Sequence, residues 1–189
     1  MSRAIAPALL LATLLLGTAT SAPLGERLAT CLACHGERGT SGTEGVPSLG
    51  GQMPDYVVTQ LFQFRERQRE APPMNDMASA LSDDDLRGFA DAVGALPAPV
   101  PAGGPPDPAL LARAQALVSK HQCKSCHGAE LTGRDALPRI RGQREDYLKA
   151  ALTAYRSNAR PGYDPAMNEV AQTLKDDEIA DLAAYIARL

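Results

Sequence analysis

The sequence predicts an all-α protein made of two tandem helical modules that are joined by a proline-rich linker. Apolar residues recur at the three- and four-residue spacing of a helix face in each half of the chain. The second half repeats the motifs of the first half in the same order. Proline dominates residues 97–108, and a segment of that composition is typical of a semi-rigid spacer between folded units.

The first residues have the pattern of an export signal. Arg3 supplies a positive charge, Ile5–Leu16 is an apolar run, and the small residues Gly17–Ala22 suit a cleavage site. The apolar run is too short to span a bilayer, which needs about 17–25 residues, so an uncleaved anchor is the weaker alternative. We therefore expect residues 1–22 to be a signal peptide that is removed on export to the periplasm.

The N-terminal module is expected to cover residues 23–96. Residues 23–30 suffice for a short helix that leads into the first cysteine motif, and Tyr56–Arg67 has the apolar face of an amphipathic helix. Proline makes residues 69–74 a predicted loop. Ser82 is a good N-cap for the last helix, because carboxylates follow it in the first turn.

The C-terminal module is expected to cover residues 109–189. Asp107 followed by Pro108 predicts the start of a helix, because aspartate caps a helix and proline is tolerated at its first position. The remaining elements follow from the internal repeat. The matching pairs are Pro47 and Pro138, Gln52 and Gln143, Tyr56 and Tyr147, Leu61 and Leu152, Arg69 and Arg160, Met74 and Met167, and Leu81 and Leu174.

Two cysteine motifs indicate the chemistry of the protein. Each has the form C-x-x-C-H-G, and the pattern is the attachment signature of a c-type haem. Two thiols on one helical turn bond to one edge of the porphyrin, and the adjacent histidine ligates the iron. A Cys₄ zinc site is the alternative, but its cysteine pairs lie about 15–20 residues apart. We therefore predict two covalently bound haem c groups. The thioether residues are Cys31, Cys34, Cys123 and Cys126, and the proximal ligands are His35 and His127.

Methionine is the leading candidate for the second axial ligand in each module. The one remaining histidine, His121, is too close to the second motif to reach across a porphyrin. Met167 is the only methionine of the C-terminal module, and Met74 stands at the matching distance before its leucine in the N-terminal module. We therefore predict Met74 and Met167 as iron ligands. Met53 and Met77 are expected to fill the core.

Residues around the haems have two interpretations each. The carbonyl groups of Pro47 and Pro138 can accept a hydrogen bond from the ligand histidine, or these residues are ordinary turn prolines. Other pairs are open in the same way. Arg69 and Arg160 either pair with haem propionates or are solvated, and Tyr56 and Tyr147 either donate a hydroxyl near a haem or the module interface or pack in the core.

The charge of the chain argues against nucleic-acid binding. The formal net charge is −3, and no basic block is present. The N-terminal module is acidic and the C-terminal module is slightly basic. This asymmetry suggests that the two modules favour different protein partners.

The repeated motifs resemble those of the dihaem cytochrome c4 family. Both halves contain C-x-x-C-H-G, P-x-L/I-x-G-Q, Y-x(4)-L and a late methionine. The resemblance implies two class I cytochrome c modules with His/Met-ligated haems. It also implies a periplasmic carrier, not an enzyme, that passes single electrons from quinol-oxidising complexes to terminal oxidases or reductases. Peripheral membrane association is compatible with that role.

Two other functions remain open at this point. Similar modules serve as the haem subunit of flavocytochrome c sulfide dehydrogenase, so the chain is alternatively the electron-accepting subunit of a periplasmic dehydrogenase. An enzyme or gas sensor with an open haem is a third hypothesis. Met74 and Met167 argue against it, because a filled sixth position leaves little chemistry at the iron.

Overall fold

The computed structural model describes residues 22–101, 103–162 and 164–189. Among them the regular elements are helices, and no strand is formed beyond one isolated bridge between Arg134 and Leu137. The predicted all-α class is therefore confirmed. The predicted signal peptide, residues 1–22, lies almost entirely outside the described residues. Within the described part of the chain, no helix has the length and apolar character that a membrane crossing requires.

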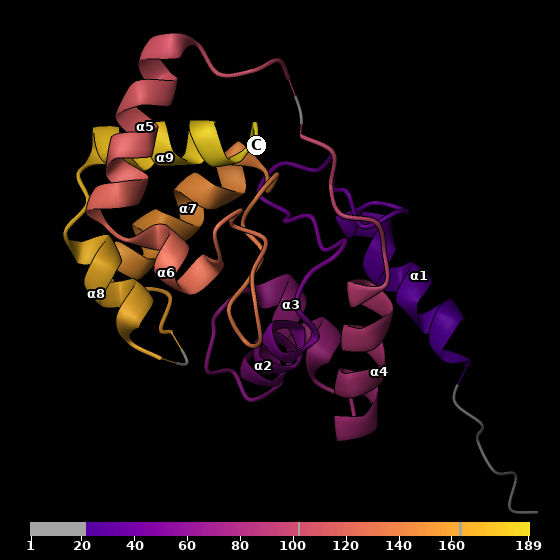
Figure 1. Cartoon of the computed structure of the whole chain (residues 1–189). Coiled ribbons are helices and arrows are strands. Elements are labelled where there is room, and N and C mark those ends of the chain that lie inside the picture. The colour runs from indigo at the N-terminus through magenta and orange to yellow at the C-terminus, as the bar shows by residue number, and fades with distance from the viewer. Residues whose placement is uncertain (1–21, 102, 163) are drawn as a thin grey trace, which may run out of the picture.

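The helices form two groups that follow the order of the chain (Figure 1). Helices α1 to α4 make up the N-terminal half, and α5 to α9 make up the C-terminal half. Their bounds are α1 Leu24–His35, α2 Pro54–Arg65, α3 Pro72–Ala78, α4 Asp83–Gly94, α5 Pro108–Lys120, α6 Cys123–His127, α7 Glu145–Arg156, α8 Ala166–Gln172 and α9 Asp176–Ile186.

The last helix of each half packs against two other helices of that half. In the N-terminal half α4 packs against α1 and α2, and in the C-terminal half α9 packs against α5 and α7. The contiguous core of the N-terminal half is small, with Val57, Ala90 and Val93 as its buried residues. The C-terminal core is larger and includes Leu131, Ile179 and other fully buried residues. A small core of this kind leaves the N-terminal half more dependent on a bound apolar group.

The predicted helix starts at Ser82 and Asp107 are confirmed. The Ser82 hydroxyl accepts from the backbone N–H of Asp85 at 3.1 Å, and the Asp85 carboxylate accepts from the backbone N–H of Ser82 at 3.0 Å. The Asp107 carboxylate accepts from the backbone N–H groups of Ala109 and Leu110 at 3.0 and 2.9 Å. Both caps satisfy donors that a helix end otherwise leaves unpaired.

Two local predictions need correction. Residues 69–74 are not all loop, because α3 begins at Pro72 and contains Met74 in its first turn. Proline is accepted at the first helical positions, where no intrahelical hydrogen bond is lost. The second methionine, Met167, is likewise in the first turn of a short helix, α8. The second correction concerns the helix predicted over residues 56–67, which begins at residue 54 and ends at residue 65.

The two halves meet through a reciprocal pair of glutamine side chains. Gln143 accepts from the backbone N–H of Ser48 at 2.8 Å and donates to its carbonyl oxygen at 2.8 Å. Gln52 accepts from the backbone N–H of Arg139 at 2.7 Å and donates to its carbonyl oxygen at 3.0 Å. We call these four residues the glutamine clamp. Each glutamine side chain binds both the N–H and the carbonyl oxygen of one residue in the other half, as the backbone of a neighbouring β-strand would. Because all four residues lie in loops, these contacts align the halves through loops and not through helices.

The beginning of the proline-rich linker also contacts both halves. A Cβ atom on Gly50 would lie 2.1 Å from the carbonyl oxygen of Pro97, and one on Gly142 would lie 3.2 Å from that of Pro99. Because Gly50 and Gly142 have no side chain, the linker can lie against the turns next to Gln52 and Gln143. The predicted spacer is therefore partly packed and does not hang free between the halves.

We expect the glutamine clamp to be a main source of interface stability. Changing Gln143 to alanine leaves the buried backbone groups of Ser48 without partners, and each such group costs about 1–3 kcal/mol. The free energy of unfolding, measured by denaturant titration with haem absorbance and circular dichroism, should fall by at least that amount. Gln68→Ala is the matched control, because Gln68 is exposed. Equal stability of the two variants would contradict a structural role for the clamp.

Candidate haem-binding sites

The structure places the histidines of both motifs in the same environment. His35 ends α1 and His127 ends α6, and the two side chains are only 7% and 6% exposed. The Nδ1 atom of His35 lies 2.8 Å from the carbonyl oxygen of Pro47, and that of His127 lies 2.9 Å from the carbonyl oxygen of Pro138. The interpretation of these prolines as histidine partners is therefore confirmed, and the plain turn interpretation is not sufficient.

This hydrogen bond determines which imidazole nitrogen is free. A carbonyl oxygen only accepts, so Nδ1 must carry the proton and donate it. Burial lowers the pKa of both His35 and His127, although the proline carbonyl partly opposes the shift. The ring is therefore neutral, and Nε2 keeps the lone pair that binds a metal.

The cysteines of each motif lie on a single helical turn with that histidine. Cys31 and Cys123 are half-buried, Cys34 and Cys126 are exposed, and none of the four forms a disulfide. Burial raises the pKa of the Cys31 and Cys123 thiols. No three His, Cys, Asp or Glu side chains of the described residues are gathered as a metal cluster. A Cys₄ zinc site therefore has no geometric support.

The two motifs nevertheless differ in how the chain enters them. In the N-terminal half, α1 runs without interruption through Cys31, Cys34 and His35. In the C-terminal half, α5 ends at Lys120, and Gln122 takes a left-handed conformation with φ 51° before α6 begins. The helix expected before the first motif is thus present, and it is continuous with the motif.

The predicted methionine ligands are followed by buried asparagines, a feature that the sequence reasoning missed. Asn75 and Asn168 are 1% and 8% exposed. The Asn75 amide donates to the carbonyl oxygens of Phe64 and Arg69, both at 2.9 Å. The Asn168 amide donates to the carbonyl oxygens of Tyr155 and Arg160, both at 3.0 Å. These bonds tie the asparagine that follows each methionine to the loop before α3 or α8 and to the end of the preceding helix. The sequence does contain a signal for this feature, because an asparagine follows the methionine at the matching position in both halves.

The other methionines and the third histidine have different surroundings. Met77 is 47% exposed, so the expectation that it fills the core is wrong. Met53 is half-buried at the start of α2. His121 caps the C-terminal end of α5, as expected for a helix-end residue, and its Nδ1 atom lies 3.2 Å from the hydroxyl of Thr173.

Two arginines and two tyrosines meet where the halves join. Arg160 is 6% exposed and donates to the hydroxyls of Tyr56 at 2.9 Å and Tyr147 at 3.2 Å. Arg69 donates to the Tyr147 hydroxyl at 3.3 Å. The tyrosines thus lie at the interface, and Arg160 is not a solvated surface charge. Neither arginine forms an ion pair with a carboxylate of the described residues.

The pKa values of the two tyrosines are shifted in opposite directions. Burial alone raises the pKa of Tyr147, but the charges of Arg160 and Arg69 outweigh it and lower the pKa to about 8. For Tyr56, burial is the larger effect and raises the pKa to about 12. The buried guanidinium of Arg160 has no carboxylate partner among the described residues, and such a group favours a nearby anion. Its presence fits a porphyrin that carries carboxylates.

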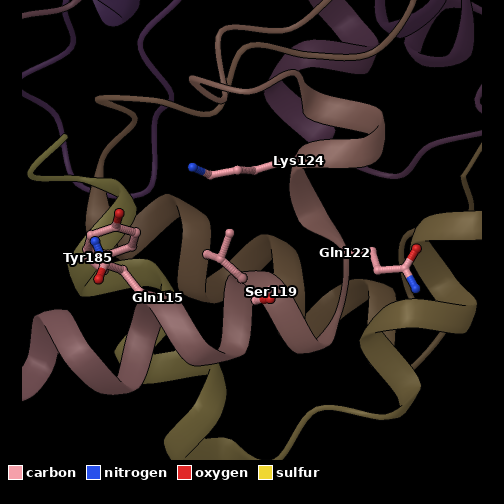
Figure 2. Close-up of a pocket in the computed structure, with 6 residues that line it drawn as sticks. Gln115, Ser119, Gln122, Lys124 and Tyr185 are labelled. Atoms are coloured by element: carbon pink, nitrogen blue, oxygen red, sulfur yellow. The ribbon is translucent and has the colours of Figure 1, made fainter.

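A surface cavity beside the second motif does not include the predicted iron ligands. It is lined by Gln115, Val118, Ser119, Gln122, Lys124 and Tyr185. Figure 2 shows Lys124 on the opposite side of this cavity from Gln115 and Ser119 of α5. The predicted ligands His127 and Met167 are absent from its lining.

Comparison with known proteins identifies the family. The family model described as cytochrome c matches residues 111–189. Cytochrome c4 of Thiocapsa roseopersicina is 33% identical over 84% of this chain and 86% of its own length. The thiosulfate dehydrogenase electron acceptor of Stutzerimonas stutzeri is 32% identical over 94% of this chain and 92% of its own length.

A solved structure extends the similarity to the fold. Reduced recombinant cytochrome c4 from Pseudomonas stutzeri superposes with a TM-score of 0.79 at 30% identity, and the match covers 88% of this chain and 96% of that one. The predicted family, fold class and cofactors are confirmed. The chain therefore belongs to the cytochrome c4 family: it carries two covalently bound haem c groups and transfers electrons, and it is not an enzyme.

Proposed function

We propose that the chain is an exported periplasmic electron carrier with two His/Met-ligated haems in separate modules. Residues 23–96 form one module, residues 109–189 form the other, and residues 97–108 connect them. The haem of the first is attached to Cys31 and Cys34 and ligated by His35 and Met74, and the haem of the second is attached to Cys123 and Cys126 and ligated by His127 and Met167.

The pair of histidine–proline hydrogen bonds is the observation that carries this proposal. At 2.8 and 2.9 Å they fix the ring orientation in both halves and leave Nε2 as the free ligand atom. The bound iron supplies one-electron redox chemistry. The chain contributes a rigid ligand on each side, since Asn75 and Asn168 hold the methionine loops. A thioether ligand favours the reduced state and raises the potential.

The proposed location is supported by the sequence pattern of residues 1–22, and the proposed partners are supported by the charges of the two halves. The signal-like pattern of residues 1–22 supports export, and covalent attachment of c-type haem takes place outside the cytoplasm in bacteria. The acidic N-terminal half and the slightly basic C-terminal half suit two different redox partners. We propose a quinol-oxidising complex as donor and a terminal oxidase or reductase as acceptor.

An electron-accepting subunit of a periplasmic dehydrogenase is the second candidate. The similarity to a thiosulfate dehydrogenase electron acceptor over nearly the whole chain favours it. Affinity purification of the tagged full-length protein at low salt separates the two functions. A stoichiometric dehydrogenase partner that reduces the haems supports the subunit, and a monomeric cytochrome supports the free carrier.

An optical and redox titration of the purified holoprotein tests the ligand assignment. We expect two haems per chain, low-spin spectra in both oxidation states, a methionine–iron charge-transfer band in the oxidised form and two one-electron steps. Haem content comes from the reduced pyridine adduct, and potentials come from spectroelectrochemistry. A high-spin five-coordinate spectrum would falsify the assignment of Met74 and Met167.

A further inference from the structure

In the N-terminal half, an arginine bonds across the stretch of chain that contains the proposed iron ligand. Arg65 is the last residue of α2, and its guanidinium donates to the carbonyl oxygen of Leu81 at 3.0 Å. The two residues are 16 positions apart, and Met74 lies between them. Arg65 also donates at 2.8 Å to the carboxylate of Asp83, the first residue of α4. It therefore closes residues 66–80, which we call the N-terminal methionine segment, into a loop.

The C-terminal half contains the same contact. Arg156 is the last residue of α7, and its guanidinium donates to the carbonyl oxygen of Leu174 at 3.2 Å. These residues are 18 positions apart, with Met167 between them. Arg156 also donates at 2.5 Å to the carboxylate of Asp176, the first residue of α9. The C-terminal methionine segment, residues 157–173, is thus bounded in the same way.

The hydrogen bond to the carbonyl group is the stronger part of this contact. The side chains of Arg65 and Arg156 are 18% and 29% exposed, whereas those of Asp83 and Asp176 are 69% and 91% exposed. Solvent and salt screen an ion pair with so exposed a carboxylate, so the pair adds little stability. A hydrogen bond from a charged and largely shielded donor contributes more.

Closure of the methionine segment controls how readily the methionine can be displaced. A competing ligand binds the iron in place of methionine only after the methionine has moved away, and that movement requires the segment to open. The Asn75 amide ties the middle of the N-terminal segment to the end of α2, and Arg65 ties its far end to the same place. Without the arginine contact, local opening costs less free energy. The apparent affinity of a competing ligand rises in proportion to the open fraction.

We propose that Arg65 and Arg156 are positioning residues that keep the axial methionine of their own half on the iron against competing ligands. Each arginine acts by closing its methionine segment and not by touching the haem. The inference rests on the proposed ligation by Met74 and Met167.

The test is a titration of the oxidised holoprotein with imidazole, a nitrogen ligand that competes for the iron. The methyl resonances of the two axial methionines, assigned with Met74→Ala and Met167→Ala variants, report each haem separately by NMR. Arg65→Gln should lower the imidazole concentration at the midpoint of Met74 displacement about tenfold and leave that of Met167 unchanged. Arg156→Gln should have the reverse effect, and it tests the inference independently of whether the Arg65→Gln holoprotein assembles.

Arg67→Gln is the matched control. Arg67 belongs to the same methionine segment, and among the described residues its side chain pairs with the exposed Asp76 alone. Asp83→Asn is a second control, because it removes the screened ion pair and retains the bond to the Leu81 carbonyl. Both controls should bind imidazole as the unmodified protein does. Arg65→Lys keeps a cationic donor and should recover part of the resistance that Arg65→Gln loses.

Three results would overturn the inference. They are an unchanged midpoint in Arg65→Gln or Arg156→Gln, an equal change at both haems in either variant, and the same fall in Arg67→Gln. Circular dichroism, recorded along the titration, should stay constant, because a loss of helical signal would mean that displacement follows unfolding of the whole half. Failure of the ligand assignment looks different, because the axial methionine resonances are then missing from the unmodified protein.

Discussion

Changing Met167 to alanine should lower the reduction potential of the haem in the C-terminal half by well over the roughly 59 mV of a tenfold equilibrium change. The thioether that stabilises the reduced iron is lost, and α8 offers no other soft ligand at that position. Spectroelectrochemistry should show one potential displaced and the other nearly unchanged. The methionine–iron band of the oxidised protein should lose about half of its intensity.

Met74→Ala should have the same effect on the other haem. The equivalence follows from the matching positions of Met74 and Met167 at the starts of α3 and α8 and from the asparagine that follows each of them. Met77→Ala is the control, because Met77 belongs to the same helix as Met74 and is 47% exposed. If Met77→Ala displaced a potential as far as Met74→Ala, the assignment in the N-terminal half would be wrong.

Removing the attachment cysteines should affect the two halves unequally. In Cys31→Ala/Cys34→Ala the N-terminal half loses its haem and retains a small contiguous core of Val57, Ala90 and Val93, with Phe64, Leu86 and Phe89 buried outside it. We expect that half to unfold, because so little buried apolar surface does not offset the cost of ordering the chain. In Cys123→Ala/Cys126→Ala the larger C-terminal core should preserve part of the helix content.

Circular dichroism and limited proteolysis measure this difference. The first double variant should lose more helical signal and release an intact C-terminal fragment after cleavage within the N-terminal half. The haem content of both variants, one group per chain, confirms that the comparison is fair. Equal loss of helix in the two variants would show that the haem contributes alike to both halves.

The sequence predicted those features that depend on residues close together in the chain. The helix caps at Ser82 and Asp107 follow from short, fixed spacings, and the structure contains them. The histidine–proline contact was one of two interpretations of a similar short spacing, and the structure decides for it. The start of α3 at Pro72 was missed, because proline disfavours a helix interior but not its first turn. Local patterns do not distinguish these two positions unless the helix end is already known.

The features that the sequence could not reveal depend on contacts between distant residues. Gln52 and Gln143 are conspicuous as a repeated motif, but nothing local indicates that each binds the backbone of the opposite half. The burial of Arg160 between Tyr56 and Tyr147 likewise exists only once the halves are placed together. Met77 was misplaced for the same reason, because its exposure is decided by which face of α3 remains uncovered.

The glutamine clamp has a consequence for how a duplicated protein can specialise. Its contacts are isologous, as in a symmetric homodimer, so each copy of the ancestral unit constrains the other at these positions. The glutamine side chains, however, bind only the main-chain atoms of Ser48 and Arg139. Mutation could therefore turn one target into serine and the other into arginine without cost to assembly. At these two positions the copies differ in side chains that the symmetric contacts do not involve.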